Sequence, residues 1–433
     1  MNTKANRKVF ISFLGATNYK YCQYVINGKK SRSLRFVQEA MLEYYAGNGW
    51  TSDDCAYLLL TEVAKARNWE NDGQKDDDGN VIKQEGLRDC LAKLDLPMNL
   101  DPIENVPMGN DETEIMAIFT LIFNLLKDGD ELYFDITHGF RYLPIIALVL
   151  GNYSKFLKNV KVKWIGYGNY EGRDSNNVAQ IVDLTTMSLL QDWTTAAADF
   201  INNGNAAKML KLTAEQDNEQ AEDMAESLCA VVDDIKTCRG MNIHQATNVK
   251  ELNTRLDNLA DSNNEITLLT PLLAKIKQSI EGFDVENENN IGNGLEAARW
   301  CINNNMSQQA ATILQETMIT HLCMRSNLEI IKIYKRDLVS KAINIKLRNI
   351  KEEDWRITGG EKEREGIKCL LENEPLIKNE TFLQVFKGLT ELRNDLNHCG
   401  MREETVASND IKDQLQNYYN ELSSIIINDN LRK

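Results

Sequence analysis

The chain has 433 residues, of which 49 are Lys or Arg, 64 are Asp or Glu and 4 are His. This length predicts two or three domains, and an apolar fraction of 42% excludes a disordered chain, a collagen and a coiled-coil rod. The net charge of −15 excludes a protein that coats nucleic acid non-specifically, although it leaves room for a local basic site.

The sequence contains neither a stretch of 18 apolar residues, as a membrane span requires, nor the apolar core of a signal peptide near its beginning. We therefore expect a cytoplasmic protein without membrane association. The nine Cys are scattered without CxxC or another zinc-binding spacing, which predicts reduced, mostly buried thiols and no metal site.

Strand-like and helical patterns alternate through the first 188 residues. The predicted strands are residues 8–14, 56–61, 131–137, 160–167 and 180–184, and the predicted helices are residues 34–45, 81–94, 112–126 and 142–156. A β-hairpin around Asn27-Gly28 is expected at residues 19–33, and an acidic, solvated loop at residues 70–80. This alternation predicts βαβ units and a Rossmann-like, mostly parallel sheet, so the expected fold class of this part is α/β.

The carboxyl ends of parallel strands share one rim of a sheet, and ligands of such sheets bind there. The predicted strands place residues 15–19, 61–62 and 137–141 on this rim. The rim is therefore the first place to look for a binding site in this half of the chain.

The segment 134–141 (FDITHGFR) joins the end of a predicted strand to the start of a predicted helix. Gly139 permits close approach of the backbone to a ligand, the helix N-terminus offers N–H groups to an anion, and Arg141 can add a bidentate phosphate contact. An ordinary strand-to-helix turn, with Thr137 capping the helix and Asp135 buried and paired, explains the same residues equally well.

A basic bias marks the beginning of the chain. Residues 1–38 contain eight Lys or Arg and no Asp or Glu. Lys29, Lys30 and Arg32 follow the first predicted strand, and we expect them on the same rim as residues 137–141, where they would attract an anionic ligand. A solvated hairpin tip is the alternative.

The rest of the chain is predicted to be helical. After a helical stretch from about residue 189 and a polar boundary loop at residues 281–294, the predicted helices are residues 295–303, 307–326, 330–350, 362–372, 381–396 and 410–428. We therefore expect an all-α region behind the α/β region, with units at residues 1–188, 189–290 and 291–433.

The end of the helix at 381–396 carries a second candidate site. Arg393 and Asn394 are followed after three residues by His398, and Gly400 stops the helix. An Arg that holds a phosphate and a His with a near-neutral pKa suit metal-free RNA cleavage, in which the 2′-hydroxyl attacks the adjacent phosphorus. A helix C-terminus with a capping His is the alternative.

Together these segments resemble a known family. Residues 10–15 (FISFLG), 60–62 (LTE) and especially 135–141 (DITHGFR) resemble a CARF domain, the CRISPR-associated Rossmann fold. Residues 393–398 (RNDLNH) are similar to the motif of HEPN ribonucleases, in which Arg, then Asn, His or Asp, precede three residues and a His. This order is that of the Csm/Csx-type CARF–HEPN ribonucleases of type III CRISPR systems, and the resemblance covers nearly the whole chain.

The resemblance implies a homodimer whose paired CARF domains bind cyclic oligoadenylate, with cyclic tetra-adenylate as the expected ring and no cofactor. Binding would activate a C-terminal HEPN bundle, reached through a helical connector, that cleaves single-stranded RNA without a metal and leaves a 2′,3′-cyclic phosphate. The rotational symmetry of the ring suits a two-fold pocket. A slow ring-nuclease activity at Thr137 is a further hypothesis.

Residue by residue, the resemblance assigns catalysis to Arg393 and His398, supported by Asn394. The ligand-binding residues predicted with it are Gly15, Ala16, Thr17, Lys29, Lys30, Arg32, Thr61, Glu62, Thr137, His138, Gly139, Phe140 and Arg141. Two other functions stay open: a non-catalytic sensor that binds the ring and signals to a partner through its helices, and a HEPN nuclease gated by a protein. The presence of both Arg393 and His398 favours the enzyme.

Overall fold

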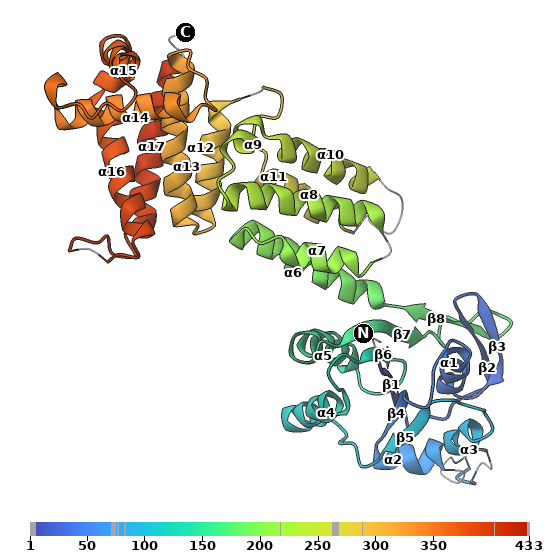
Figure 1. Cartoon of the computed structure of the whole chain (residues 1–433). Coiled ribbons are helices and arrows are strands. Elements are labelled where there is room, and N and C mark those ends of the chain that lie inside the picture. Colours follow the sequence, from blue (N-terminus) through green and yellow to red (C-terminus); the bar gives the residue numbers. More distant parts are fainter. Residues whose placement is uncertain are drawn as a thin grey trace. The chain divides into compact units, whose positions relative to one another are not determined.

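The computed structural model describes residues 6–430 apart from residues 71–74, 76–77, 82–83, 217, 262–267, 288 and 402 (Figure 1). The chain divides into two compact units, Met1–Gln191 and Asp192–Lys433. The first contains a mostly parallel sheet with helices and the second is helical, so the expected fold class, α/β followed by all-α, is confirmed.

The first unit is built on an eight-stranded sheet of order β3-β2-β8-β7-β6-β1-β4-β5. The strands are β1 Lys8–Leu14, β2 Cys22–Ile26, β3 Lys29–Leu34, β4 Cys55–Leu60, β5 Asn99–Ile103, β6 Glu131–Asp135, β7 Lys161–Gly168 and β8 Val178–Asp183. Strands β7, β6, β1, β4 and β5 are parallel, whereas β8 is antiparallel to β7. Strand β2 is parallel to β8, and β3 is antiparallel to β2.

The helices of this unit cover both faces of the sheet (Figure 1). They are α1 Val37–Ala46, α2 Glu62–Ala64, the π-helical turn η1 Lys65–Trp69, α3 Leu87–Leu91, α4 Glu112–Leu125 and α5 Leu143–Lys158. Of the predicted helix at residues 81–94, the described part is helical only in α3, and residues 82–83 lie outside the described residues.

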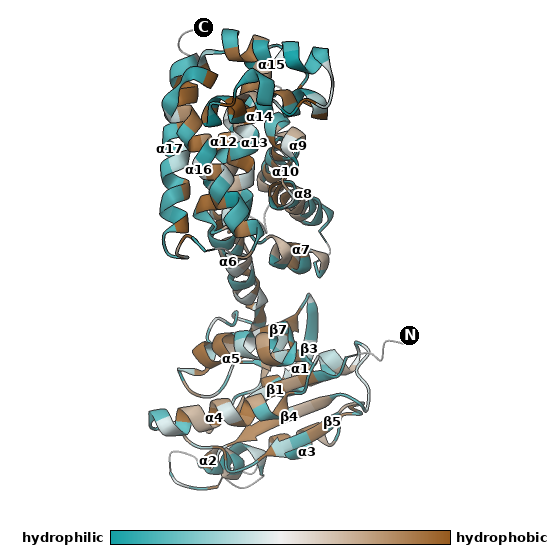
Figure 2. Ribbon diagram, turned by 60° about the vertical axis from the view of Figure 1, so that its left-hand side comes forward, coloured by the Kyte–Doolittle hydropathy of each residue, from teal (hydrophilic) through white to brown (hydrophobic). Residues whose placement is uncertain are grey.

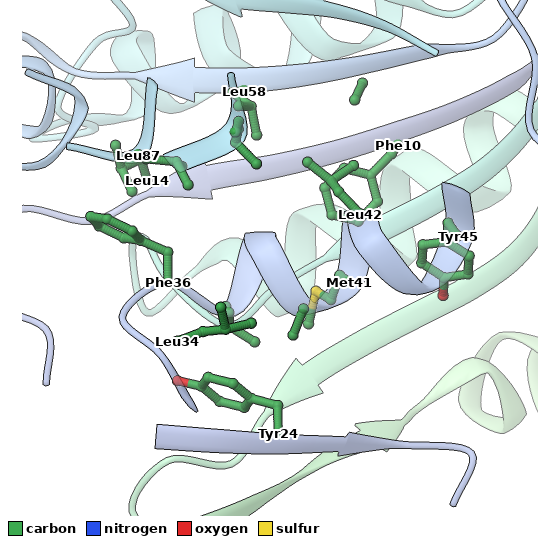
Figure 3. Packing of buried hydrophobic residues seen from close by; sticks show 14 of the residues in the cluster. Phe10, Leu14, Tyr24, Leu34, Phe36, Met41, Leu42, Tyr45, Leu58 and Leu87 are labelled. Carbon is green, nitrogen blue, oxygen red and sulfur yellow. The ribbon is translucent and has the colours of Figure 1, made fainter. Parts of the chain in front are cut away.

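Alternate residues of the central strands feed two separate cores, as the period of two in a strand requires. Phe10, Leu14 and Leu58 pack with α1 and α3 on one face (Figure 3). On the other face, Ile11 and Leu59 pack with α4 and α5. Strand β1 therefore has residues buried on both faces, which explains its nearly continuous apolar sequence.

The described residues of the second unit form helices joined by loops and turns, without strands. Its helices are α6 Thr185–Asn203, which begins within the first unit, α7 Ala207–Ala214, α8 Glu219–Lys236, α9 Gly240–Gln245, α10 Thr247–Asp261, α11 Thr270–Ser279, α12 Ile291–Asn303, α13 Ser307–Arg325, α14 Ile333–Arg348, α15 Glu361–Asn373, α16 Glu380–Asn397 and α17 Ile411–Asn430, with the short 3-10 turns η2 Glu352–Asp354 and η3 Pro375–Lys378.

Helices α12, α13, α16 and α17 pack against one another, and α14 with α15 flanks them. Figure 2 shows hydrophilic and hydrophobic stretches alternating along α15, α16 and α17, as expected for amphipathic bundle helices. Helix α12 begins at Ile291, inside the predicted boundary loop, because the Asn290 side chain accepts a hydrogen bond from Gly292 N and caps it. Within the described residues, no helix is long and apolar enough to cross a membrane.

Candidate functional site

The carboxyl ends of the central strands meet at one rim, as the sequence predicts. Leu14 at the end of β1 is in register with Leu60 at the end of β4, and Ser12 is in register with Asp135 at the end of β6. The segments that begin with Gly15, Thr61 and Ile136 therefore emerge from neighbouring strands on the same edge of the sheet. We call this edge, with residues 15–19, 61–62 and 136–141, the ligand rim.

The buried carboxyl group of Asp135 holds the turn at residues 136–141 in place. Its side chain is fully buried, and Oδ2 accepts a hydrogen bond from Ser12 Oγ at 2.6 Å. Oδ1 accepts from Thr137 N at 2.9 Å and from Thr137 Oγ1 at 2.5 Å. Burial raises the pKa of Asp135, while these hydrogen bonds oppose the shift. The carboxyl group thus folds the turn back onto the end of its own strand.

Thr137 does not cap the helix that follows the turn, which was the alternative in the sequence analysis. Its Oγ1 donates to Asp135 and accepts from Gly168 N at 2.7 Å, so it ties the turn to β7. Helix α5 begins only at Leu143, so capping by Thr137 is wrong, and Arg141 lies in the turn before the helix. The Thr137 hydroxyl thus donates one hydrogen bond and accepts another within the turn. A ring-nuclease activity at Thr137 stays a prediction.

Two aromatic rings meet above Gly15. The Tyr19 and His138 rings lie 4.3 Å apart between centroids and are tilted by 36°. A Cβ on Gly15 would lie 2.1 Å from Tyr19 Oη and 3.6 Å from His138 Cβ, so only glycine allows this close approach. Burial lowers the pKa of the partly buried His138 to about 4, and its imidazole is therefore neutral at pH 7.

The remaining residues of the turn differ in exposure. Gly139 has φ +123°, a conformation that L side chains rarely adopt. The Phe140 ring packs edge-on against Phe13 and stacks on Tyr142, so it supports the turn from the core side. Arg141 is exposed and is the cationic side chain of this turn.

Thr61 and Glu62 lie at the end of β4. The Thr61 side chain is buried and its Oγ1 caps the short helix α2 by accepting from Ala64 N at 3.2 Å, whereas Glu62 is exposed. Thr61 therefore has a structural partner, and Glu62 would bring a negative charge to the rim.

Lys29, Lys30 and Arg32 lie on β3, the edge strand that β2, β8, β7 and β6 separate from β1. The predicted hairpin is present at Asn27-Gly28, and its strand β2 pairs with β8 near the carboxyl end of β7, since Val25 is opposite Gln180 and Ile181 is opposite Gly168. Lys29 stands over the ring of Tyr44 near the end of α1. Arg32 pairs with Glu39 at 3.4 Å and Glu43 at 3.7 Å. Contact of these three side chains with a ligand at the rim stays a prediction.

The second candidate site lies at the end of α16. Arg393 is partly exposed, and its Nη1 donates to Gln315 Oε1 at 2.6 Å and lies 3.9 Å from Glu316 Oε1. Gln315 is buried on α13, and its Nε2 donates to Thr390 Oγ1 at 2.7 Å. Gln315, which holds the guanidinium of Arg393, could not be predicted from the sequence, because a Gln within a buried helix carries no distinguishing pattern.

Asn394 and His398 are both exposed. His398 ends α16, and its N–H donates to Asn394 O at 3.0 Å. Cys399 with φ 55° and Gly400 with φ 66° then reverse the chain, and Gly400 N donates to Asp395 O at 2.9 Å. The helix end thus presents an imidazole to solvent with its backbone fixed.

The other two histidines are buried. His321 lies 3.2 Å from Asp429 Oδ2, beside Arg325. His244 is buried, and its Nδ1 lies 3.2 Å from Asn290 O. Within the described residues, no group of three or more His, Cys, Asp and Glu is placed to hold a metal ion.

Comparisons with known proteins bear on both units. Residues 9–171 match the family model of the CRISPR system endoribonuclease Csx1, CARF domain, and residues 189–289 match that of the CRISPR-associated protein MJ1674, second domain. The chain is 26% identical over 312 residues to CRISPR-associated protein MJ1674 of Methanocaldococcus jannaschii, a match that covers 70% of this chain and 47% of that protein. Residues 9–171 form a CARF domain.

The chain spans about half the length of the curated relative that it matches. Among solved structures, Enterococcus italicus Csm6 bound to cyclic hexa-2'-fluoro-hexa-dAMP is similar with a TM-score of 0.44 and 13% identity, over 98% of this chain and 94% of that one. We call Met1–Gln191 the CARF unit from here on.

The CARF unit contains supporting residues that the sequence analysis did not single out. Gln38 is fully buried, and its Nε2 donates to Ser12 Oγ and to Phe13 O, both at 3.1 Å. Asn68 and Arg35 lie beneath residues 15–17. These polar residues occur in helical or irregular segments without a motif, so only the fold reveals their connection to the ligand rim.

The lowered pKa of His138 predicts a specific acid sensitivity. In the folded protein this pKa is about 4, against 6.5 for the unfolded chain, so the unfolded state binds the proton first as the pH falls. The neutral imidazole therefore contributes to the free energy of unfolding in full above pH 6.5. As the pH falls toward 4, on the order of 2–3 kcal/mol of this free energy is lost. Urea denaturation between pH 7 and 4 should show a smaller loss of the free energy of unfolding for His138→Gln than for wild type. Equal losses would show that His138 does not cause the acid sensitivity.

Proposed function

We propose that this chain is a ribonuclease of type III CRISPR antiviral defence that cyclic oligoadenylate activates. The expected activator is cyclic tetra-adenylate, the substrate is single-stranded RNA, and the protein acts in the cytoplasm as a homodimer. One observation carries the proposal: a CARF unit with the DITHGFR turn precedes a helical unit in which α16 carries Arg393, Asn394 and His398 at its C-terminal end.

The ligand rim has the chemistry that a ring of nucleotides needs. Arg141 is exposed for a phosphate, and Gly139 allows the backbone to approach a ligand closely. The neutral ring of His138 and the ring of Tyr19 offer aromatic surfaces on which a base can stack. These features support an anionic ligand with aromatic bases rather than a protein partner.

An exposed apolar face next to the ligand rim supports the homodimer. Ile145, Val149, Tyr153 and Phe156 follow one another along α5 at helical spacing, with exposures of 66%, 54%, 47% and 86%. Helix α4 is also strongly apolar, yet its buried residues are Ile118 and Ile122 alone. A second copy seated on this face would cover it, and because α5 starts just after Arg141, the pairing would bring two ligand rims together.

The dimer predicts the effect of charge on this face. The double variant Ile145→Glu and Phe156→Glu should convert the protein to monomers and remove ring binding, because two carboxylates cannot be buried without partners. Light scattering after size-exclusion chromatography measures the change. Val81→Glu, at another exposed apolar residue of the CARF unit, should leave the mass at two chains. A dimeric double variant would show that another surface pairs the chains.

At the end of α16 the proposed chemistry is an internal transfer at phosphorus. His398 accepts the proton of the RNA 2′-hydroxyl, and the 2′-oxygen bonds to the adjacent phosphorus. The bond to the 5′-oxygen of the next nucleotide breaks, and this oxygen receives a proton from the protonated His398 of the second copy. Arg393 stabilises the charge on the phosphoryl oxygens. The products are a 2′,3′-cyclic phosphate and a free 5′-hydroxyl.

A fluorogenic RNA assay in EDTA, with cyclic tri-, tetra- and hexa-adenylate added separately, tests the proposal. We expect cleavage with one ring size, cyclic tetra-adenylate, and 2′,3′-cyclic phosphate ends by mass spectrometry. Ring binding without any cleavage would favour a non-catalytic sensor. Cleavage that no ring affects would favour a nuclease gated by a protein.

A further inference from the structure

We propose that the backbone N–H groups of Ala16 and Asn18 bind a phosphate of the ring, and that Asn68 and the buried Arg35 are the positioning residues that turn them toward it. This inference rests on the proposed function, because it names the contact that one segment of the ligand rim makes. Its test is chosen so that the two can fail separately.

Asn68 holds the loop after β1 from below. It is fully buried on the π-helical turn η1, and its Nδ2 donates to Gly15 O and to Thr17 O, both at 2.8 Å. Both amide protons of one side chain are thus used to orient two carbonyl groups of the same loop. In addition, Arg67 Nη1 donates to Ala16 O at 3.4 Å.

The orientation of these carbonyls fixes the opposite side of the loop. The chain has no cis peptide bonds, and in a trans peptide the C=O and the following N–H point in opposite directions. Because Gly15 O and Thr17 O point to Asn68, the N–H groups of Ala16 and Asn18 point away from it. Neither N–H donates to a described residue, and Ala16 is partly exposed and Asn18 exposed. Two N–H groups that point outward from one loop form a site for an anion.

The loop lies where a ring contacting Arg141 would reach it. A Cβ on Gly15 would lie 3.6 Å from His138 Cβ, so the loop and the turn at residues 137–141 are in contact. The two segments can therefore bind parts of one ligand. The N–H pair would supply a second phosphate contact beside that of Arg141.

Arg35 places a positive charge under this loop. Its side chain is only 4% exposed, Nη2 donates to Asn68 Oδ1 at 2.9 Å, and Nη1 donates to Glu85 O at 2.9 Å. Nε has no hydrogen-bond partner, and no carboxylate in the described part of the chain lies within ion-pair distance of the guanidinium. Burial lowers the pKa of Arg35, as expected for a cation without a counter-ion. A phosphate on the loop would be that counter-ion, with Asn68 between them.

The first test changes one atom of Asn68. Asn68→Asp keeps the shape and can still accept from Arg35, but it cannot donate to the two carbonyls and it neutralises the buried charge. We expect the Kd for cyclic tetra-adenylate to rise by about 10-fold or more in equilibrium titrations of the full chain. Arg35→Lys should retain the salt dependence of binding, whereas Arg35→Met should lower its slope, an effect that a purely structural role would not produce. If Arg141→Ala binds cyclic tetra-adenylate more weakly than wild type but Asn68→Asp has an unchanged Kd, the inference is overturned.

The second test uses the wild-type protein and does not depend on how the variants fold. Gly15-Ala16 is the only Gly-Ala pair in the sequence, so labelling Gly carbonyls with ¹³C and Ala nitrogens with ¹⁵N isolates the Ala16 amide. Saturating cyclic tetra-adenylate should move its proton signal downfield, as a hydrogen bond to phosphate requires. A signal unmoved at saturation would overturn the inference. A wild type that binds no ring would instead reject the proposed function.

Discussion

Replacing His398 with Ala should lower the rate of ring-activated RNA cleavage by about 10²–10⁴-fold, the range in which a general acid or base contributes. The imidazole is exposed at the end of α16, where its backbone is held by the bond from His398 N to Asn394 O. Its loss therefore removes a proton acceptor without opening a core. Titration of the same variant with cyclic tetra-adenylate should give the wild-type Kd, because the ligand rim belongs to the other unit.

Lys387→Ala is the matched control for this result. Lys387 lies on the same helix, its side chain is 56% exposed, and it pairs only loosely with Glu391 at 4.0 Å. Lys387→Ala removes one positive charge from α16 but leaves His398 and the end of the helix unchanged. We expect cleavage within about twofold of wild type. Equal losses in both variants would show that the charge of α16, and not the imidazole, supports cleavage.

Asp135→Ala should cost about 3–5 kcal/mol in the free energy of unfolding of the CARF unit and abolish ring binding. The carboxyl group accepts hydrogen bonds from Ser12 Oγ, Thr137 N and Thr137 Oγ1 in a fully buried position. Without it these donors lose their acceptor, and the turn that presents His138 and Arg141 is released. Urea denaturation and ring titration at low temperature measure the two effects.

Asp130→Ala separates stability from binding. Asp130 is the buried carboxylate at the other end of β6, where it accepts from Arg7 Nε at 3.0 Å and from Lys127 N at 2.6 Å. Its loss should destabilise the protein by a similar amount, because another buried network is broken. Ring affinity of the folded fraction should persist, since this edge of the sheet is opposite the ligand rim. Loss of affinity in both variants would mean that Asp135 acts through stability alone.

Local patterns were sufficient where neighbours in sequence are also neighbours in space. The alternation of apolar runs predicted β1 at its observed bounds, and the bundle helices α13 and α16 agree with their predicted ranges to within about one residue at each end. The carboxyl-end rule then placed Gly15, Thr61 and Thr137 on one rim, because parallel strands bring such segments together whatever their order.

Local sequence patterns could not predict which strands pair when they are far apart in the sequence. Strand β5 has the sequence NLDPI, which is poor in strand-forming residues, and it forms because it is an edge strand where Pro102 needs no N–H partner on one side. The place of Lys29 on an edge strand depends on the pairing of β2 with β8, about 155 residues later in the chain. Asn68, Arg35 and Gln315 act through single contacts across the fold, which leave no periodic signal.

We expect occupancy of the ligand rim to control cleavage at the end of α16. The most direct measurement follows ring binding and RNA cleavage in the same samples while cyclic tetra-adenylate is titrated into the full chain in EDTA. The cleavage rate should rise in proportion to bound ring and reach its plateau at one ring per two chains. Cleavage that is already maximal without ring, or that stays absent when the rim is saturated, would contradict it.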